Sequence, residues 1–118
     1  MTELVACLLT GKGTWSEVAK LIKAEQWEKI ILITNQFGKE TFKANDKTEL
    51  LVIDDRGPLD VLVKEITEGL RNKLIGPEIA LNFISGTGKE HMALLSSLLK
   101  LGFGIRLVHV VEDKVDEV

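Results

Sequence analysis

Two short glycine-containing segments carry the residue types that bind phosphate. Residues 85–89 read SGTGK between an apolar run and a leucine-rich stretch, and residues 10–14 read TGKGT after another apolar run. Where a strand turns into a helix, backbone N–H groups and the positive end of the helix point at an anion, and a lysine adds a full charge. We therefore expect a phosphate-containing ligand at these segments.

The residues expected to contact this ligand lie in the two segments or close to the ends of the apolar runs. One glycine turn after a strand is a weak signal, because tight turns require glycine in any case. A purely structural role therefore stays open for each loop, and the convergence of both loops on one pocket would carry more weight. The candidate ligand-binding residues are Thr10, Gly11, Lys12, Gly13, Thr14, Asn35, Ser85, Gly86, Thr87, Gly88, Lys89 and His91.

The elements that must position these residues follow an alternating pattern. Apolar, β-branched-rich segments at residues 4–9, 29–34, 50–54, 78–83 and 105–111 alternate with amphipathic ones, which is typical of an α/β domain. We expect one Rossmann-like three-layer sandwich over residues 1–118, with a five-stranded, mainly parallel sheet in the order 3-2-1-4-5. Strands 1 and 4 are then neighbours at the switch point, where such sheets bind ligands.

Helix boundaries are predicted from capping and stop signals. Thr14 and Glu17 form a capping-box pattern, and that helix is expected to end near Trp27. Pro58 suits the first turn of another helix. Asp54, Asp55 and Arg56 before it suit either a ligand-side loop or a helix cap. Residues 35–48 stay open between a short helix and a hairpin, and the acidic residues 112–117 are expected to form a solvated end.

The last predicted helix is unusually apolar. It runs from Met92 to Leu101, contains five leucines and ends at Gly102, a suitable C-terminal cap. Two interpretations stay open: the helix is enclosed within one subunit, or one side of it packs against a second copy.

Composition narrows the class of protein. The net charge of −3 argues against a surface that grips duplex DNA along its whole extent. A single cysteine, Cys7, excludes a disulfide framework and is expected to be a buried thiol. The apolar runs are too short to span a membrane, and the N-terminus lacks signal-peptide features, so we expect a cytoplasmic location.

More specific nucleotide-binding and metal-binding motifs are absent from the sequence. A Walker A loop would need glycine at Phe83 and Ser or Thr at Glu90, and the dinucleotide fingerprint would need glycine at Ser16. The two histidines do not form a metal site with the scattered carboxylates. The sequence therefore argues against a nucleoside triphosphatase, and no metal or cofactor is expected.

Residues 82–92, NFISGTGKEHM, with the leucine-rich helix after them, resemble the second signature of CARF domains, the CRISPR-associated Rossmann-fold sensors. Residues 10–14 match the first signature. The resemblance implies a homodimer that binds cyclic oligoadenylate, an antiviral second messenger, in a pocket on the two-fold axis. Most such domains are fused to an effector. For this sequence the resemblance leaves three possibilities open: a stand-alone sensor, a ring nuclease and a part of a longer protein. Gly88 departs from the family pattern, which has its basic residue directly after Gly-Thr.

A ring nuclease would act without a metal, through attack of a ribose 2′-OH on the adjacent phosphate. The catalytic candidates are then Lys89 for charge stabilisation, helped by Lys12, and Thr10 or Ser85, with Thr14 as a further choice, to orient the nucleophile. We expect sensing in preference to cleavage. The alternatives are a structural dimerisation or interaction module and a domain that binds a mononucleotide or another small phosphate.

Overall fold

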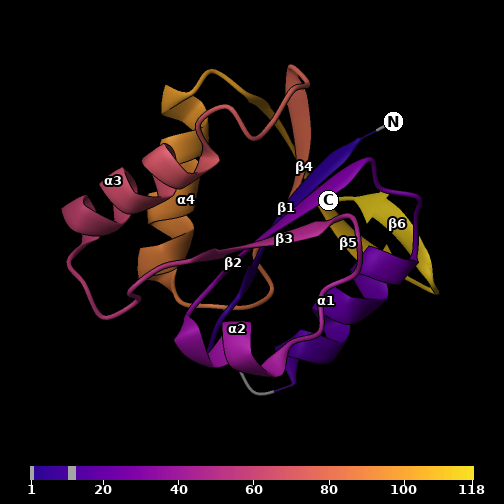
Figure 1. The fold of residues 1–118 in the computed structure, drawn as a ribbon. Coiled ribbons are helices and arrows are strands. Elements are labelled where there is room, and N and C mark those ends of the chain that lie inside the picture. The colour runs from indigo at the N-terminus through magenta and orange to yellow at the C-terminus, as the bar shows by residue number, and fades with distance from the viewer. Residues whose placement is uncertain (1, 11–12) are drawn as a thin grey trace.

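The computed structural model describes residues 2–10 and 13–118, which form an α/β fold with helices on both faces of one sheet (Figure 1). The elements in chain order are β1 (Glu3–Leu8), α1 (Thr14–Lys23), β2 (Lys29–Thr34), α2 (Gln36–Thr41), β3 (Thr48–Val52), α3 (Leu59–Leu70), β4 (Glu78–Asn82), α4 (Gly88–Lys100), β5 (Gly104–Val111) and β6 (Lys114–Glu117).

The sheet has the order β3-β2-β1-β4-β5-β6, and its first five strands are parallel. This confirms the Rossmann-like fold class and the predicted order of those strands. Leu8 lies opposite Thr34, and Thr34 lies opposite Val52. The carboxyl ends of β1, β2 and β3 therefore meet at one edge of the sheet.

Two apolar cores fill the space between the sheet and the helices. Helices α3 and α4 pack together over one face, through side chains such as Leu62, Ile66 and Leu98. Helix α1 covers the other face through Val18 and Leu21. All six residues of β1 are buried, because this central strand is covered on both faces, as continuous apolar strands of parallel sheets are.

The predicted strand count was wrong, because the described residues form a sixth strand. Glu112 and Asp113 have positive φ values of 50° and 66° and reverse the chain. Strand β6 then pairs antiparallel with β5, with Val115 opposite Val110. The acidic C-terminal residues are thus part of the sheet, and apart from Val115 they are exposed, as expected of a solvated end.

The predicted capping box at Thr14 was also wrong. Gly13, with a φ of 82°, is the N-cap residue of α1, so Thr14 is already the first residue of the helix. The helix ends at Lys23, four residues before Trp27. Glycine tolerates this left-handed conformation, and it turns the chain so that the helix begins one residue after it.

Residues 35–48, for which a short helix and a hairpin were both open, contain a short helix, α2. Asn35 caps it by accepting a hydrogen bond from the backbone N–H of Gly38 at 2.9 Å. Helix α4 begins at Gly88, earlier than predicted, and Gly102 follows its end with a φ of 88°, as expected of a C-terminal cap residue. In the described part of the chain, no helix has the length and apolar character needed to cross a membrane.

Candidate functional site

The loops after β1 and β4 are joined directly by hydrogen bonds. The backbone N–H of Leu9 donates to Ser85 Oγ at 2.8 Å, and Ser85 Oγ donates to the carbonyl oxygen of Leu9 at 3.1 Å. The backbone N–H of Gly86 donates to the carbonyl oxygen of Thr10 at 2.7 Å. Thr10 and the pair Ser85 and Gly86, where the two predicted phosphate loops begin, therefore lie side by side at the switch point of the sheet.

Ser85 and His91 hold the β4–α4 loop through hydrogen bonds within the protein. Ser85 is fully buried, and its hydroxyl is engaged with Leu9 as described. The His91 ring donates from Nε2 to the carbonyl oxygen of Ser85 at 2.7 Å and stacks on Phe83 at a ring separation of 4.8 Å. Because their polar atoms bond within the protein, both side chains hold the loop in shape.

The start of α4 is neutralised by a carboxylate of the chain itself. Buried Glu90 accepts hydrogen bonds from Thr87 N at 2.9 Å and from Thr87 Oγ1 at 2.6 Å. A carboxylate here satisfies the positive end of the helix. Burial raises the pKa of the nearby Cys7 thiol to about 12, and the negative charge of Glu90 adds to the shift. The prediction that Cys7 is buried is confirmed.

Lys89 lies against the turn after β3. Its Nζ donates to the carbonyl oxygen of Gly57 at 2.8 Å, and the residue is half-buried. Hydrogen bonds from the backbone N–H and the guanidinium of Arg56 lower the pKa of Asp54 below its ordinary value of 3.8, and the charge of Lys89 contributes. Lys89 thus connects the β4–α4 loop to the acidic turn at residues 54–57.

The start of α1 differs from the start of α4. Its N-cap residue, Gly13, is exposed and has no side chain with which to cap the helix, and its carbonyl oxygen accepts from Ser16 Oγ at 2.8 Å. The first-turn N–H groups of a helix need partners from outside the helix. Thr10 is exposed beside this helix start, and the predicted contacts Gly11 and Lys12 lie outside the described residues.

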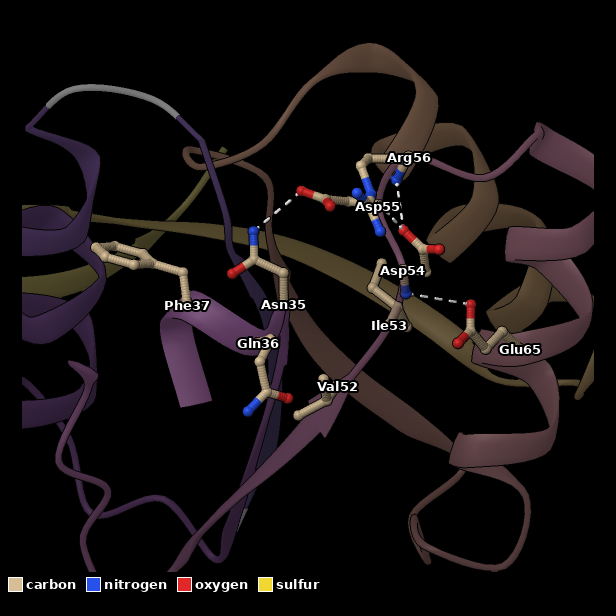
Figure 2. A pocket seen from close by; sticks show the side chains of 9 residues that line it. All are labelled: Asn35, Gln36, Phe37, Val52, Ile53, Asp54, Asp55, Arg56 and Glu65. Atoms are coloured by element: carbon tan, nitrogen blue, oxygen red, sulfur yellow. Dashed lines mark hydrogen bonds and ion pairs between the residues drawn. The ribbon is translucent and has the colours of Figure 1, made fainter. Parts of the chain in front are cut away.

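A cavity of about 480 Å³ lies over the carboxyl ends of β2 and β3. Figure 2 shows its side chains, with Phe37 on one side and Glu65 on the other. Asn35 Nδ2 donates to Asp55 Oδ2 at 3.0 Å across it. Its lining residues are Asn35, Gln36, Phe37, Val52, Ile53, Asp54, Asp55, Arg56 and Glu65.

The structure brings most of the described candidate residues to this end of the sheet, in two groups. Gly86 bonds to Thr10 and Ser85 bonds to the adjacent Leu9, whereas Asn35 belongs to the neighbouring cavity. Sequence reasoning missed Phe37 and Glu65 as lining residues, since no motif marks them. Asp54 and Asp55 were noted, and their place directly after β3 was the usable signal.

Residues 2–10 and 13–118 contain no group of three or more His, Cys, Asp or Glu side chains that would hold a metal ion. Comparison of the chain with protein-family models and with curated proteins gave no match.

Proposed function

We propose that this chain binds a nucleotide-type phosphate ligand above the carboxyl ends of β1 and β4, with cyclic oligoadenylate as the leading ligand. The main support for this proposal is the pair of contacts that join the two loops, from Ser85 to Leu9 and from Gly86 to Thr10. They hold the two loops side by side at the switch point, which is where open α/β sheets bind ligands. The specific ligand rests on the CARF-like motifs.

The start of α1 is the better phosphate acceptor of the two helix starts. Glu90 already neutralises the start of α4, and its carboxylate would repel an incoming anion. The first turn of α1 also contains an acidic residue, Glu17, but this side chain is exposed and pairs with Lys20 Nζ at 3.9 Å. Thr10 adds an exposed hydroxyl beside it, and the lysine at position 12 supplies a positive charge in the same loop.

Sensing accounts for the site better than cleavage does. In-line attack by a ribose 2′-OH requires groups that orient the nucleophile and stabilise charge. The hydroxyl of Ser85 is held by Leu9, and the ammonium of Lys89 donates to Gly57. Among the catalytic candidates that the structure describes, Thr10 is the one that is exposed. This supports a site that binds the ring and leaves it intact.

An exposed apolar stripe on α4 supports the dimeric form of this proposal. Met92, Leu95 and Leu99 follow helical spacing and are 60%, 37% and 61% exposed, while Leu94 and Leu98 are buried in the core. A second copy of the chain packed on this stripe would give the homodimer that the CARF resemblance implies.

Calorimetry with cyclic tetra-adenylate and cyclic hexa-adenylate tests the proposal. We expect saturable heat with one of the rings at micromolar protein, and about tenfold weaker binding in Thr10→Ala, which loses one hydrogen bond to phosphate. Lys100→Ala at the far end of α4 is the matched control and should bind as the wild type does. Absence of heat with both rings would refute the proposal.

Two further measurements separate the alternatives. Chromatography of the ring after prolonged incubation detects cleavage, and sensing predicts that the ring is recovered intact. Loss of binding on dilution to monomer supports a shared pocket, whereas dilution-independent binding supports a mononucleotide-type site within one subunit. Lack of stabilisation by any nucleotide in a thermal-shift screen would favour a structural interaction module.

A further inference from the structure

The cavity at Asn35 and Asp55 lies beside the proposed phosphate site. Leu8, Thr34 and Val52 are paired across β1, β2 and β3, so the residues that follow these strands stand one and two strand spacings from the loop after β1. Two spacings are about 10 Å. A nucleotide with its phosphate at the start of α1 therefore has its sugar and base within reach of this cavity.

Asp55 presents an oriented acceptor there. Its Oδ2 accepts from Asn35 Nδ2 at 3.0 Å, and Asn35 is itself fixed because its Oδ1 accepts from Gly38 N at 2.9 Å. Within residues 2–10 and 13–118, no hydrogen bond occupies Asp55 Oδ1. Asn35 thus acts as a positioning residue for a carboxylate whose second oxygen is available to a ligand hydroxyl.

Phe37 presents an aromatic surface in the same cavity. Its side chain is 65% exposed. The ring lies 5.8 Å from that of Trp15, and Trp15 is fixed by donation from Nε1 to the carbonyl oxygen of Leu9 at 2.8 Å. An exposed aromatic ring held in place in this way is suited to stacking against a nucleobase.

The charge of the cavity selects the part of the ligand that enters it. Asp54, Asp55 and Glu65 outnumber Arg56 among its charged lining residues, so a phosphate is disfavoured. Carboxylate oxygens are acceptors only and bind hydroxyl donors strongly. Carboxylates near the strand ends of such folds commonly accept from a ribose 2′-OH.

We infer that this cavity binds the ribonucleoside part of the phosphate ligand, with the base stacked on Phe37 and a ribose 2′-OH donating to Asp55. The inference rests on the proposed function for the placement of the phosphate. It goes further in making the protein selective for a ribose with a free 2′-OH, and in excluding a 2′-phosphate by repulsion from Asp55.

The test takes the ring that the wild type binds, cyclic tetra-adenylate or cyclic hexa-adenylate, and compares it with its 2′-deoxy counterpart by calorimetry on the full chain. The wild type should bind the ribose ring about tenfold or more tightly, as one charge-assisted hydrogen bond predicts. Asp55→Asn keeps an acceptor for Asn35 but removes the charge, so it should weaken binding of the ribose ring and leave the deoxy ring unchanged. Phe37→Ala should weaken both rings.

Two matched controls make the result specific. Asp46→Asn removes an exposed carboxylate before β3, at the opposite end of that strand, and Ile75→Ala removes an apolar side chain that is 88% exposed elsewhere. Both should bind like the wild type, and thermal unfolding should confirm that all variants are folded. Equal wild-type affinity for the two rings, with Asp55→Asn unchanged, overturns the nucleoside inference while phosphate binding stands. Failure of the wild type to bind cyclic tetra-adenylate, cyclic hexa-adenylate or their 2′-deoxy counterparts overturns the proposed function and this inference with it.

Discussion

The hydroxyl of Ser85 and the backbone of Leu9 exchange two hydrogen bonds although the residues stand 76 positions apart in the chain. The contact is buried and joins the loop after β1 to the loop after β4. The Ser85 side chain, which was predicted to contact a ligand, therefore also links the two halves of the sheet.

Replacing Ser85 by alanine should destabilise the fold. The substitution leaves the buried N–H of Leu9 without its partner, which costs about 2 kcal/mol. Urea unfolding of the variant measures this loss. Ser96→Ala on α4 is the control, because Ser96 is only half-buried and should change stability by less than about 0.5 kcal/mol. A Ser85→Ala protein as stable as the wild type would show that the contact is energetically neutral.

Gly38 and Thr34 should show strong coupling. A Cβ at position 38 would overlap Thr34 Oγ1, and that buried hydroxyl donates to the carbonyl oxygen of Leu8 at 2.6 Å. We expect Gly38→Ala to lose about 2 kcal/mol through overpacking. Adding Thr34→Ala makes room for the new methyl group, so the double variant should lose less than the sum of the single losses. Additive losses in a double-mutant cycle would contradict the overlap.

Cys7 should make the protein lose stability at alkaline pH. Its thiol has an ordinary pKa of 9.0, which burial raises to about 12 in the folded chain. Below pH 9 the thiol is neutral in both states. Between these two values it ionises only in the unfolded chain, so the free energy of unfolding falls by up to about 1.4 kcal/mol per pH unit.

Urea unfolding at about pH 8 and about pH 10.5 checks this dependence on Cys7. Other groups also titrate in this range, so Cys7→Ala supplies the baseline. Over the same interval, the free energy of unfolding should fall further in the wild type than in the variant, and the difference between the two losses should be about 2 kcal/mol. The same fall in both proteins would show that the thiol is not protected in the folded state.

The stripe of Met92, Leu95 and Leu99 should control association. A carboxylate in the centre of an apolar interface between two copies is costly to bury, so Leu99→Asp should shift the protein from dimer to monomer. Sedimentation equilibrium measures the shift, and circular dichroism should show an intact fold. Ile75→Ser, another exposed apolar site, should leave association unchanged. A wild-type protein that sediments as a monomer at every concentration would refute the dimer.

The strands were the most predictable part of the molecule. Residues 29–34 form β2 with the predicted bounds, because a continuous β-branched run flanked by polar residues has few other stable arrangements. β6 was missed because its turn uses Glu112 and Asp113 at positive φ. A hairpin of that kind is usually signalled by Asn-Gly or Asp-Gly.

Local signals were ambiguous where the same pattern occurs twice. A threonine followed three residues later by glutamate is present at Thr14 and again at Thr87, and the glutamate reaches back to the threonine at the second. The left-handed conformation of Gly13 decides the first case, and no rule of spacing reveals it. The contact of Lys89 with Gly57 likewise spans 32 residues, so its direction depends on how α3 and α4 pack.

The fixed ring of Trp15 gives the protein an internal optical reporter. The chain has two tryptophans, and Trp27 is 2% exposed within the core with its Nε1 bonded to the carbonyl oxygen of Leu21. Trp15 instead lies 5.8 Å from Phe37. A nucleobase that stacks on Phe37 should therefore change the emission of one tryptophan and leave the other as an internal reference, so occupancy can be followed without labelling either molecule.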